Sequence, residues 1–221
     1  MESQFWHERW QQGQIAFHQP EVEKFLGAHF ERLGLARGAT VFVPLCGKSL
    51  DMLWLVSQGY QVVGVELSPI ACEAFFSENR IEAATPVTEG PFRVHRAKHQ
   101  PITLYEGDFF QLSARQTGPL AAFYDRASLI ALPPAMRERY AEHFQREMLA
   151  PSTSGLLLTV AYQSNTFPGP PFSIPSEEVH RLWGERFQLE QVGQGEEVVG
   201  PPTQRISTAK SAWLLTPKAG R

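Results

Sequence analysis

The sequence has few cysteines, no long apolar run and little net charge. Cys46 and Cys72 are too few for a disulfide framework and have no metal-ligand spacing, so we expect two reduced thiols and no metal. No apolar run approaches the roughly 20 residues that span a bilayer, and the N-terminus lacks the apolar centre of a signal peptide. A net charge of −3 gives no attraction to nucleic acid or anionic membranes. These absences predict a cytoplasmic protein with a small-molecule ligand.

The length and composition are those of one ordinary domain. The chain has 221 residues, of which 43% are hydrophobic and 19% charged, which suits a single α/β domain with a sizeable core. Neither a repeat nor a linker divides it. We therefore expect residues 1–221 to form one domain and the protein to be a monomer, with residues 1–34 serving as an N-terminal lid and a covering helix.

Residues 41–66 are the most informative part of the chain. Residues 41–45 and 62–65 have the continuous apolar character of buried parallel strands, and residues 49–58 between them can form an amphipathic helix. The crossover in such a unit is right-handed, which places the turn at Gly47 and the carboxylate of Glu66 at the same sheet edge. A carboxylate there can accept both hydroxyls of a ribose, so the sequence predicts Glu66 as a ribose ligand.

The rest of the chain continues the alternation of strands and helices. A helix covering one sheet face is expected to begin at Pro20. The other expected helices are 69–79, 134–149 and 176–183, and the other strands are 102–105, 120–124, 155–162 and an antiparallel pair, 187–192 and 212–215. In the insert 80–101 only residues 92–94 resemble an edge strand, and its role is left open.

Polar residues end several of the predicted strands, at the Gly47 turn, Glu66, Asp108 and Arg126. A nicotinamide dinucleotide would need a G-x-G-x-x-G turn for its pyrophosphate, but Leu45 stands where a glycine is required. The phosphate-binding pattern G-x-x-x-x-G-K-[ST] also fails, because its first glycine would fall inside a strand. A ligand with a ribose and an adenine but no phosphate fits better, and S-adenosylmethionine is the common cofactor of that kind.

Two aromatic segments can cover this edge. The first contains Trp6, Trp10, Phe17 and His18, and either packs on the domain or forms a lid over a heterocycle. The second, residues 167–175, is too rich in proline for a strand and is expected to form a loop over the site.

Four strings give the chain a specific resemblance: FVPLCGKS at 42–49, VGVE at 63–66, YDRASL at 124–129 and FPGPPF at 167–172. Together with the aromatic N-terminus, they resemble the thiopurine S-methyltransferase family over nearly the whole chain. The resemblance implies a Rossmann-like class I methyltransferase fold, with a seven-stranded, mostly parallel sheet, helices on both faces and an N-terminal lid. It implies S-adenosyl-L-methionine as cofactor, S-adenosyl-L-homocysteine as product and S-methylation of aromatic and heterocyclic thiols.

The resemblance also implies site residues. The cofactor contacts are expected at Trp10, Leu45, Gly47, Glu66, Asp108, Phe109 and Arg126. The substrate contacts are expected at Phe17, His18, Arg126 and Arg205, the last matched in a divergent C-terminal region. Most class I methyltransferases have an acidic residue and further glycines in the first loop, where this chain has Val43, Leu45 and Ser49, an alteration that the thiopurine branch shares.

Chemical roles follow for a few of these residues. Arg126 is the predicted catalytic residue, because a fixed cation favours a substrate thiolate. His18 is either a hydrogen-bonded lid residue or a proton acceptor. Asp125 is expected to have a structural role, either orienting Arg126 or capping the next turn, and Cys46 to fill space rather than act as a nucleophile. Two other functions stay open, a nicotinamide-dependent reductase and a nucleoside-binding module without turnover.

Overall fold

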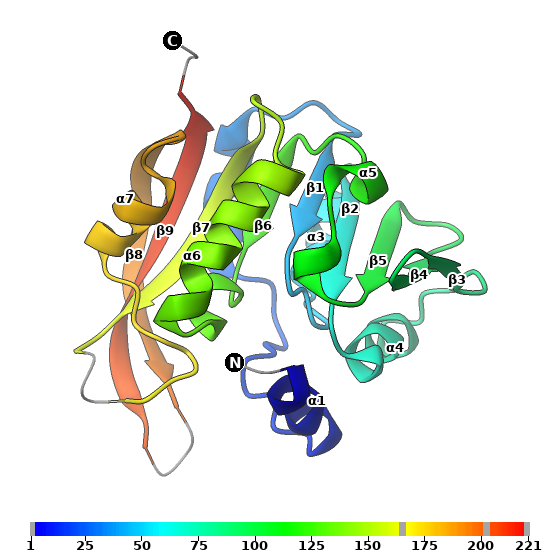
Figure 1. Ribbon diagram of the computed structural model, residues 1–221, viewed down its shortest axis with the longest axis horizontal. Helices are drawn as coiled ribbons and strands as arrows, with labels where there is room; N and C mark the ends of the chain where they lie inside the picture. Colours follow the sequence, from blue (N-terminus) through cyan, green and yellow to red (C-terminus); the bar gives the residue numbers. More distant parts are fainter. Residues whose placement is uncertain (1–2, 164–166, 201–203, 219–221) are drawn as a thin grey trace.

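A single nine-stranded sheet forms the centre of the computed structural model, which describes residues 3–163, 167–200 and 204–218 (Figure 1). The strand order is β3-β4-β5-β2-β1-β6-β7-β9-β8. The five central strands are parallel, as predicted: β5 (Ile102–Glu106), β2 (Gln61–Glu66), β1 (Thr40–Val43), β6 (Ala122–Asp125) and β7 (Ser154–Ala161). Val41 pairs with Val62 in a parallel register, so the predicted βαβ unit is present.

The expectation of seven strands was wrong, because the insert adds a hairpin to one edge. It consists of β3 (Val87–Glu89) and β4 (Phe92–Arg96), and β4 pairs antiparallel with β5. Phe92 and Val94 are buried against the core, whereas the residue between them, Arg93, is exposed. The hairpin is too short, and its outer strand too exposed, to give a strong periodic signal in the sequence.

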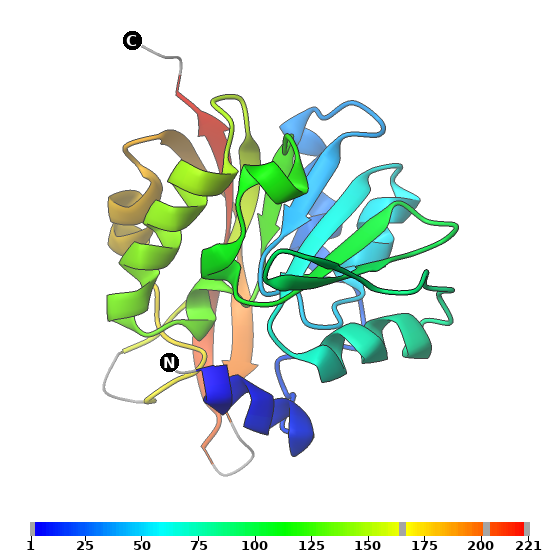
Figure 2. The same ribbon diagram turned by 45° about the vertical axis from the view of Figure 1, so that its right-hand side comes forward.

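Helices cover both faces of the sheet (Figures 1 and 2). One face carries α2 (Lys24–His29), α3 (Asp51–Ser57) and α4 (Pro69–Glu78), and the other carries α5 (Ala114–Thr117), α6 (Pro134–His143) and α7 (Ser176–Trp183). Successive strand residues point to opposite faces, so Phe123 packs in the core under α6 and α7 while its neighbour Tyr124 packs under α2 and α3.

The first covering helix begins later than predicted, at Lys24 rather than Pro20. Glu23 is extended, with φ −63° and ψ 126°, and its carboxylate caps the helix by accepting from the Phe25 N–H at 3.2 Å. Its own backbone N–H donates to the carboxylate of Asp51 at 2.8 Å. This long-range hydrogen bond holds residue 23 outside the helix. The helix ends in a 3₁₀ turn, η1 (Phe30–Leu33).

The predicted helices at 69–79, 134–149 and 176–183 are confirmed, with one change in geometry. After His143 the second of these widens into a π-helical turn, η4 (Phe144–Met148). Short 3₁₀ turns also follow β5 and β6, at η2 (Phe109–Gln111) and η3 (Leu129–Ala131).

The last two strands form an antiparallel pair at the sheet edge, as predicted, but they are much longer. They are β8 (Phe187–Val199) and β9 (Ile206–Pro217), with a register shift between Gln191 and Gly193. β9 pairs with β7 as far as Ala209, and beyond that residue the β8–β9 ladder has two strands only. This extension brings β8 and β9 to the edge where the parallel strands end.

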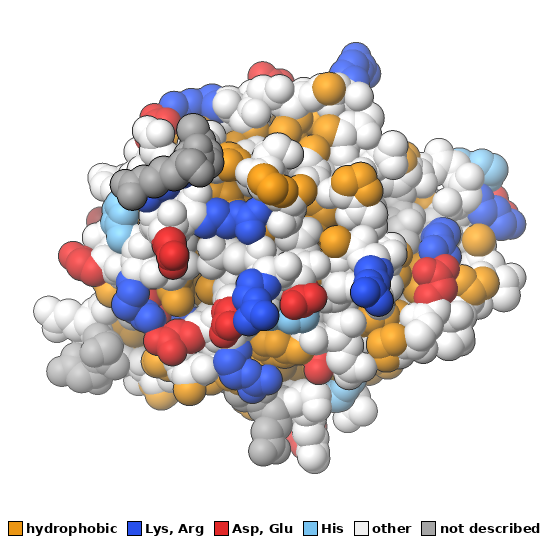
Figure 3. All heavy atoms as spheres, turned by 45° about the horizontal axis from the view of Figure 1, so that its top comes forward, with side chains coloured by type: hydrophobic (Ala, Val, Ile, Leu, Met, Phe, Trp, Pro, Cys, Tyr) orange, Lys and Arg blue, Asp and Glu red, His pale blue; other side chains and the backbone are white. Residues whose placement is uncertain are grey.

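The outer surface agrees with the near-neutral composition. On the face turned forward in Figure 3, acidic and basic side chains are interspersed. Among the described residues, none of the helices has the length and apolarity needed to cross a membrane.

Candidate active site

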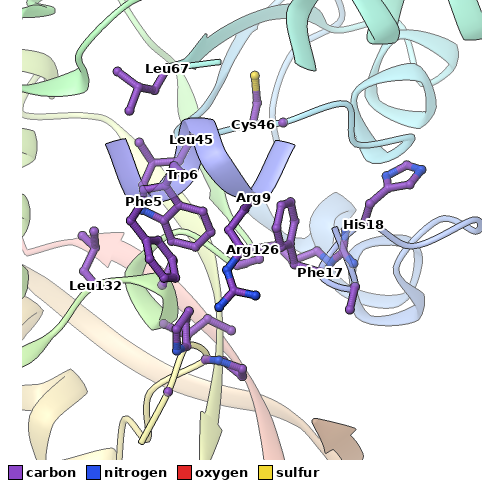
Figure 4. A pocket seen from close by; sticks show the side chains of 18 of the residues that line it. Phe5, Trp6, Arg9, Phe17, His18, Leu45, Cys46, Leu67, Arg126 and Leu132 are labelled. Atoms are coloured by element: carbon purple, nitrogen blue, oxygen red, sulfur yellow. The ribbon is translucent and has the colours of Figure 1, made fainter. Parts of the chain in front are cut away.

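A cavity of about 1190 Å³ lies at the carboxyl edge of the parallel strands (Figure 4). It is enclosed by α1 (Ser3–Gln11), the strand ends, residues 167–171 and the far end of the β8–β9 hairpin. The structure brings together nine of the ten residues singled out in the sequence: Trp10, Phe17, His18, Leu45, Gly47, Glu66, Asp108, Phe109 and Arg126 all line it. Arg205 is exposed and does not line this cavity.

Glu66 is bound to the backbone of both neighbouring turns. One carboxylate oxygen accepts from the Gly47 N–H at 2.8 Å and the other from the Ser68 N–H at 2.7 Å. The side chain is almost fully buried, and burial raises the pKa of Glu66, while the hydrogen bonds from Ser68 and Gly47 act in the opposite direction. These contacts fix the carboxylate at the tip of β2, with its edge in the cavity wall.

The turn between β1 and α3 has an unusual backbone. Leu45 has a φ of +43° and Gly47 a φ of +52°, so both lie in the left-handed region. A leucine is disfavoured there, and such strain is typical of ligand sites. The Cys46 N–H donates to the Val65 carbonyl at 2.9 Å, which ties the turn to β2. A Cβ on Gly47 would lie 3.4 Å from the Trp10 ring, so the indole covers this turn closely.

The same turn is poorly suited to a phosphate. In a dinucleotide or P-loop site the backbone N–H groups of the glycine turn bind phosphate oxygens. Here the Gly47 N–H is used by Glu66, and the adjacent Lys48 is paired with Glu78 at 2.7 Å. A buried carboxylate behind the turn would also repel a phosphate. The donor set therefore fits a ribose-bearing ligand without phosphate.

Cys46 fills space, as predicted. Its thiol is buried, and a Cβ on Gly64 would come within 2.7 Å of the sulfur, so the glycine makes room for it. Burial, and to a smaller extent the charge of Glu66, raises the pKa of Cys46 well above its usual range. A protonated thiol in this position is not a nucleophile.

The end of β5 is built around Asp108. Its carboxylate caps η2 by accepting from the Phe110 N–H at 3.0 Å. The ring of Phe109 is 2% exposed and packs tightly against Tyr140, with centroids 4.8 Å apart. Asp108 and Phe109 thus reach the cavity wall from a rigid turn, and Phe109 also serves the core.

Arg126 takes part in a chain of charged groups beside the cavity, of which Arg126, Lys210 and Glu197 line it. Its guanidinium lies 3.3 Å from the carboxylate of Asp51 and 3.8 Å from that of Glu23. Lys210 then lies 2.6 Å from Glu23 and 3.2 Å from Glu197. The chain alternates in sign and contains three carboxylates and two cations.

Sequence reasoning identified only one member of this charged chain. Lys210 lines the cavity because it lies opposite Val160 near the end of β7, and Glu197 reaches it from β8. Asp51 reaches Arg126 from the start of α3. The pairs are separated by 13 to 187 residues in the sequence, which leaves no local spacing to detect. Lys210 is a further cation in the cavity lining, which the sequence prediction missed.

Asp125 caps the following turn, as predicted. It accepts from the Leu129 N–H at 3.2 Å and from the Tyr140 hydroxyl at 2.8 Å, and it is fully buried. Burial raises the pKa of Asp125 to about 6, against the effect of these hydrogen bonds.

The N-terminal aromatic residues pack on one another beside the cavity. Trp6 and Trp10 each meet Phe17 edge to face, with centroids 5.8 and 5.6 Å apart. His18 follows, and burial together with the charge of Lys48 lowers the pKa of His18. A lowered pKa keeps the imidazole neutral at neutral pH, so it can accept a hydrogen bond. Figure 4 shows Trp6, Phe17 and His18 around the same pocket as Leu45 and Arg126.

The proline-rich segment forms part of the cavity wall, as expected, through Phe167 and residues 168–171. Phe172 differs from its neighbours. Its N–H donates to the Ile130 carbonyl at 2.6 Å, and its ring lies 5.7 Å from the guanidinium of Arg137. Phe172 thus anchors the loop instead of lining the cavity.

Solved structures with a similar fold are methyltransferases. An S-adenosylmethionine-dependent methyltransferase from Anabaena variabilis superposes with a TM-score of 0.65 at 14% identity, covering 98% of this chain and 95% of that one. The 1,6-didemethyltoxoflavin-N1-methyltransferase of Burkholderia thailandensis, solved with its substrate and S-adenosylhomocysteine, gives 0.61 at 16% identity, covering 97% and 87%. The fold is that of the class I S-adenosylmethionine-dependent methyltransferases.

The sequence comparison narrows this class to a family. Residues 1–215 match the family model described as thiopurine S-methyltransferase (TPMT). The thiopurine S-methyltransferase of Pseudomonas fluorescens (strain Pf0-1) is 46% identical over 200 residues, covering 90% of this chain and 89% of the relative. That of Pseudomonas syringae pv. pisi is 47% identical over 193 residues, covering 87% of each. The chain belongs to the thiopurine S-methyltransferase family.

Proposed function

We propose that this protein transfers the methyl group of S-adenosylmethionine to the sulfur of aromatic and heterocyclic thiols such as thiopurines. The observation that carries the proposal is the buried carboxylate of Glu66, held by the Gly47 and Ser68 N–H groups in the wall of an aromatic cavity. It offers a fixed acceptor for ribose hydroxyls at the strand end where this fold binds nucleosides. Family membership supports the same reaction.

The cofactor-side residues follow from the cavity wall. Glu66 would accept the ribose hydroxyls, and Leu45 and Gly47 would bring bare backbone to the ligand. Asp108 and Phe109 would lie on the adenine side, at the neighbouring strand end. Trp10 would cover the cofactor, because its indole already packs on the Gly47 turn.

Bound S-adenosylmethionine supplies a methyl group on a positively charged sulfur. The protein's task is to align a thiol sulfur in line with that methyl group and to exclude water. As the new sulfur–carbon bond forms and the old one breaks, the substrate's proton passes to solvent. Neutral His18, which lines the cavity, would accept a hydrogen bond from the thiol.

Arg126 would favour the anionic form of the substrate. The carboxylates of Asp51 and Glu23 partly balance the charge of Arg126. Arg126 would therefore act on the substrate mainly through a directed hydrogen bond and a positive potential close to its guanidinium. Lys210, joined to Arg126 through Glu23, adds a further cation beside it.

The substrate side would accept flat apolar rings. Phe17 and Phe167, with the prolines of residues 168–171, offer broad surfaces and few directional hydrogen bonds. A pocket of this kind distinguishes poorly between rings of similar size, so we expect broad selectivity. No role is assigned to Arg205, which lies outside the lining.

A direct experiment compares ligands and then turnover. Calorimetry with S-adenosylmethionine, S-adenosylhomocysteine and NADH should show binding of the first two, and a methyl-transfer assay with a thiopurine and with thiophenol should yield the methylated sulfides. Binding of NADH alone would favour the reductase. Cofactor binding without methyl transfer to any thiol would favour a nucleoside-binding module without turnover.

We also propose that the chain acts as a single-domain cytoplasmic monomer, without nucleic-acid or membrane partners. One continuous sheet and a net charge of −3 support this. Sedimentation at working concentration should give the mass of one chain, 24.9 kDa. A dimer mass would refute the monomer.

A further inference from the structure

Outside the cavity, three side chains with metal-ligating atoms converge at the edge of the sheet. Cys72 comes from α4, His95 from β4 and Glu106 from the end of β5. One ligand atom from each lies within 4.8 Å of the other two. We propose that this cluster binds a divalent, thiophilic cation of the zinc type.

The topology explains why the three side chains meet. In the antiparallel register of β4 and β5, His95 lies opposite Leu104 and Arg93 opposite Glu106, so these side chains share one sheet face. That face is covered by α4, whose Phe76 stacks on the His95 ring at 6.1 Å and 27°. Cys72 lies one turn before Phe76 and therefore points at the same place.

The cluster has the composition of a zinc site. Thiolate, imidazole and carboxylate are all zinc ligands, and three protein ligands with one open position is a common arrangement. A thiolate and a carboxylate also balance the charge of a divalent ion. Bonds of about 2.0 to 2.3 Å place tetrahedral zinc ligands roughly 3.5 Å apart. The ligand atoms lie within 4.8 Å of one another and His95 and Glu106 are 2.7 Å apart, so zinc would draw the more distant atoms together and replace the hydrogen bond between His95 and Glu106.

The orientation of the ligands is already largely set. The His95 ring is 3% exposed and makes a 2.7 Å hydrogen bond to Glu106, and Cys72 is fully buried. The side chain of Glu106 retains 16% exposure, which leaves an entry side and a place for a water ligand. Arg93 lies 3.7 Å from Glu106 and also pairs with Glu73 on the exposed side, so it can move away when a cation enters.

Metal binding would release the thiol proton to solvent as the sulfur–metal bond forms. It would also connect α4 to β4 and β5. These elements carry the segments that follow Glu66 and precede Asp108, so the ion would stabilise the back of the proposed cofactor site without entering the cavity.

The test uses the full chain, reduced and freed of metal by a chelator, and then titrated with Co²⁺ and with Zn²⁺. A cysteine ligand gives cobalt a thiolate-to-metal charge-transfer band in the near ultraviolet, which surface histidines and carboxylates cannot produce. We expect that band at one equivalent, its loss on addition of zinc, and a higher melting temperature with zinc than with chelator.

Cys46→Ser is the matched control, because Cys46 is also a buried thiol but is not a member of the cluster. It should retain the band. Loss of a residue that only hydrogen-bonds to a metal ligand typically weakens metal binding by about 10- to 100-fold. Cys72→Ala and His95→Gln each remove a ligand itself, so they should weaken binding by at least that factor. Arg93→Gln should tighten binding, because a nearby cation is removed.

Melting temperatures in chelator show whether each variant is folded before metal is added. The proposal is overturned if the wild-type protein shows no charge-transfer band, or if the band survives in folded Cys72→Ala or disappears in folded Cys46→Ser.

Discussion

The guanidinium of Arg126 lies 3.3 Å from the carboxylate of Asp51, a side chain with no exposed surface. Asp51 also accepts from the Tyr124 hydroxyl at 3.0 Å and from the Glu23 backbone at 2.8 Å. A buried carboxylate with these partners fixes the position of Arg126 at the end of β6. The proposed catalytic cation is therefore held from behind, by a residue outside the cavity lining.

Removing the charge of Arg126 should lower activity in a pH-dependent way. We expect Arg126→Lys to keep part of the activity, and Arg126→Met to reduce kcat/KM by about 100-fold, similar to the loss of one preorganised donor. The loss should be largest for thiols that are protonated at the assay pH. Raising the pH should restore part of it, because solution then supplies the thiolate. A pH profile of kcat/KM measures this.

A double variant separates this chemical role from a structural one. Arg126→Met leaves Asp51 buried with one partner fewer, which can cost about 3–5 kcal/mol of stability. In Asp51→Asn/Arg126→Met both charges are gone, so the melting temperature should recover while the activity stays low. Recovery of both together would contradict a role for Arg126 in the reaction.

Glu66→Gln should weaken cofactor binding through the ribose. We expect a loss of about 2 kcal/mol or more for S-adenosylhomocysteine, since a charged acceptor is replaced by a neutral amide. An analogue without the ribose hydroxyls should bind wild type and variant alike. Calorimetry of wild type and variant, each with S-adenosylhomocysteine and with the analogue, gives the coupling energy between Glu66 and the ribose hydroxyls. An equal loss for both ligands would show that Glu66 only stiffens the Gly47 turn.

Trp10→Ala should raise the dissociation constants of cofactor and product together, if α1 acts as a lid. A truncation lacking residues 1–19 should remain folded but bind both weakly. The matched control is Trp54→Ala on α3, where the indole packs on Phe30 outside the cavity lining. That variant should lose stability but keep its ligand affinity. Normal cofactor binding by the truncated protein would refute the role of α1 as a lid.

The raised pKa of Asp125 predicts a stability that falls with pH. Its folded-state pKa of about 6 exceeds the ordinary value of 3.8, so the folded protein holds a proton that the unfolded chain has released. This contribution is fully present below pH 3.8 and is lost as pH rises through about 6.

Asp125→Asn removes that dependence. A rise of the Asp125 pKa from 3.8 to about 6 corresponds to roughly 3 kcal/mol. Relative to wild type, the variant should therefore gain up to that much unfolding free energy between pH 4 and pH 8. Denaturant titrations at both pH values check this. A difference that stays constant with pH would place the Asp125 pKa at its ordinary value.

The sequence alone predicted the parallel centre of the sheet and the convergence of its strand ends. Short apolar runs rich in valine, such as residues 62–65, are typical of buried parallel strands, and the handedness of the crossover then places Gly47 beside Glu66. The capping role of Asp125 was also predictable, because caps depend on residues close in sequence. Leu45 was read correctly as evidence against a dinucleotide turn.

What the tertiary structure decided depends on contacts between distant segments. The sequence of the β3–β4 hairpin indicated an edge strand only at residues 92–94, and the exposed strand β3 gives no clear period, so the pairing of β4 with β3 and β5 identifies the whole hairpin. Leu45 adopts a left-handed conformation because the turn is tied to β2.

Clusters of side chains from distant segments were also not predictable from the sequence. Asp51 meets Arg126 across 75 residues. Cys72, which has no ligand spacing in the sequence, meets His95 and Glu106 through the packing of α4 on the sheet. Local patterns specify elements and caps, whereas groups of charged or ligating side chains form only when the strand register and helix packing are fixed.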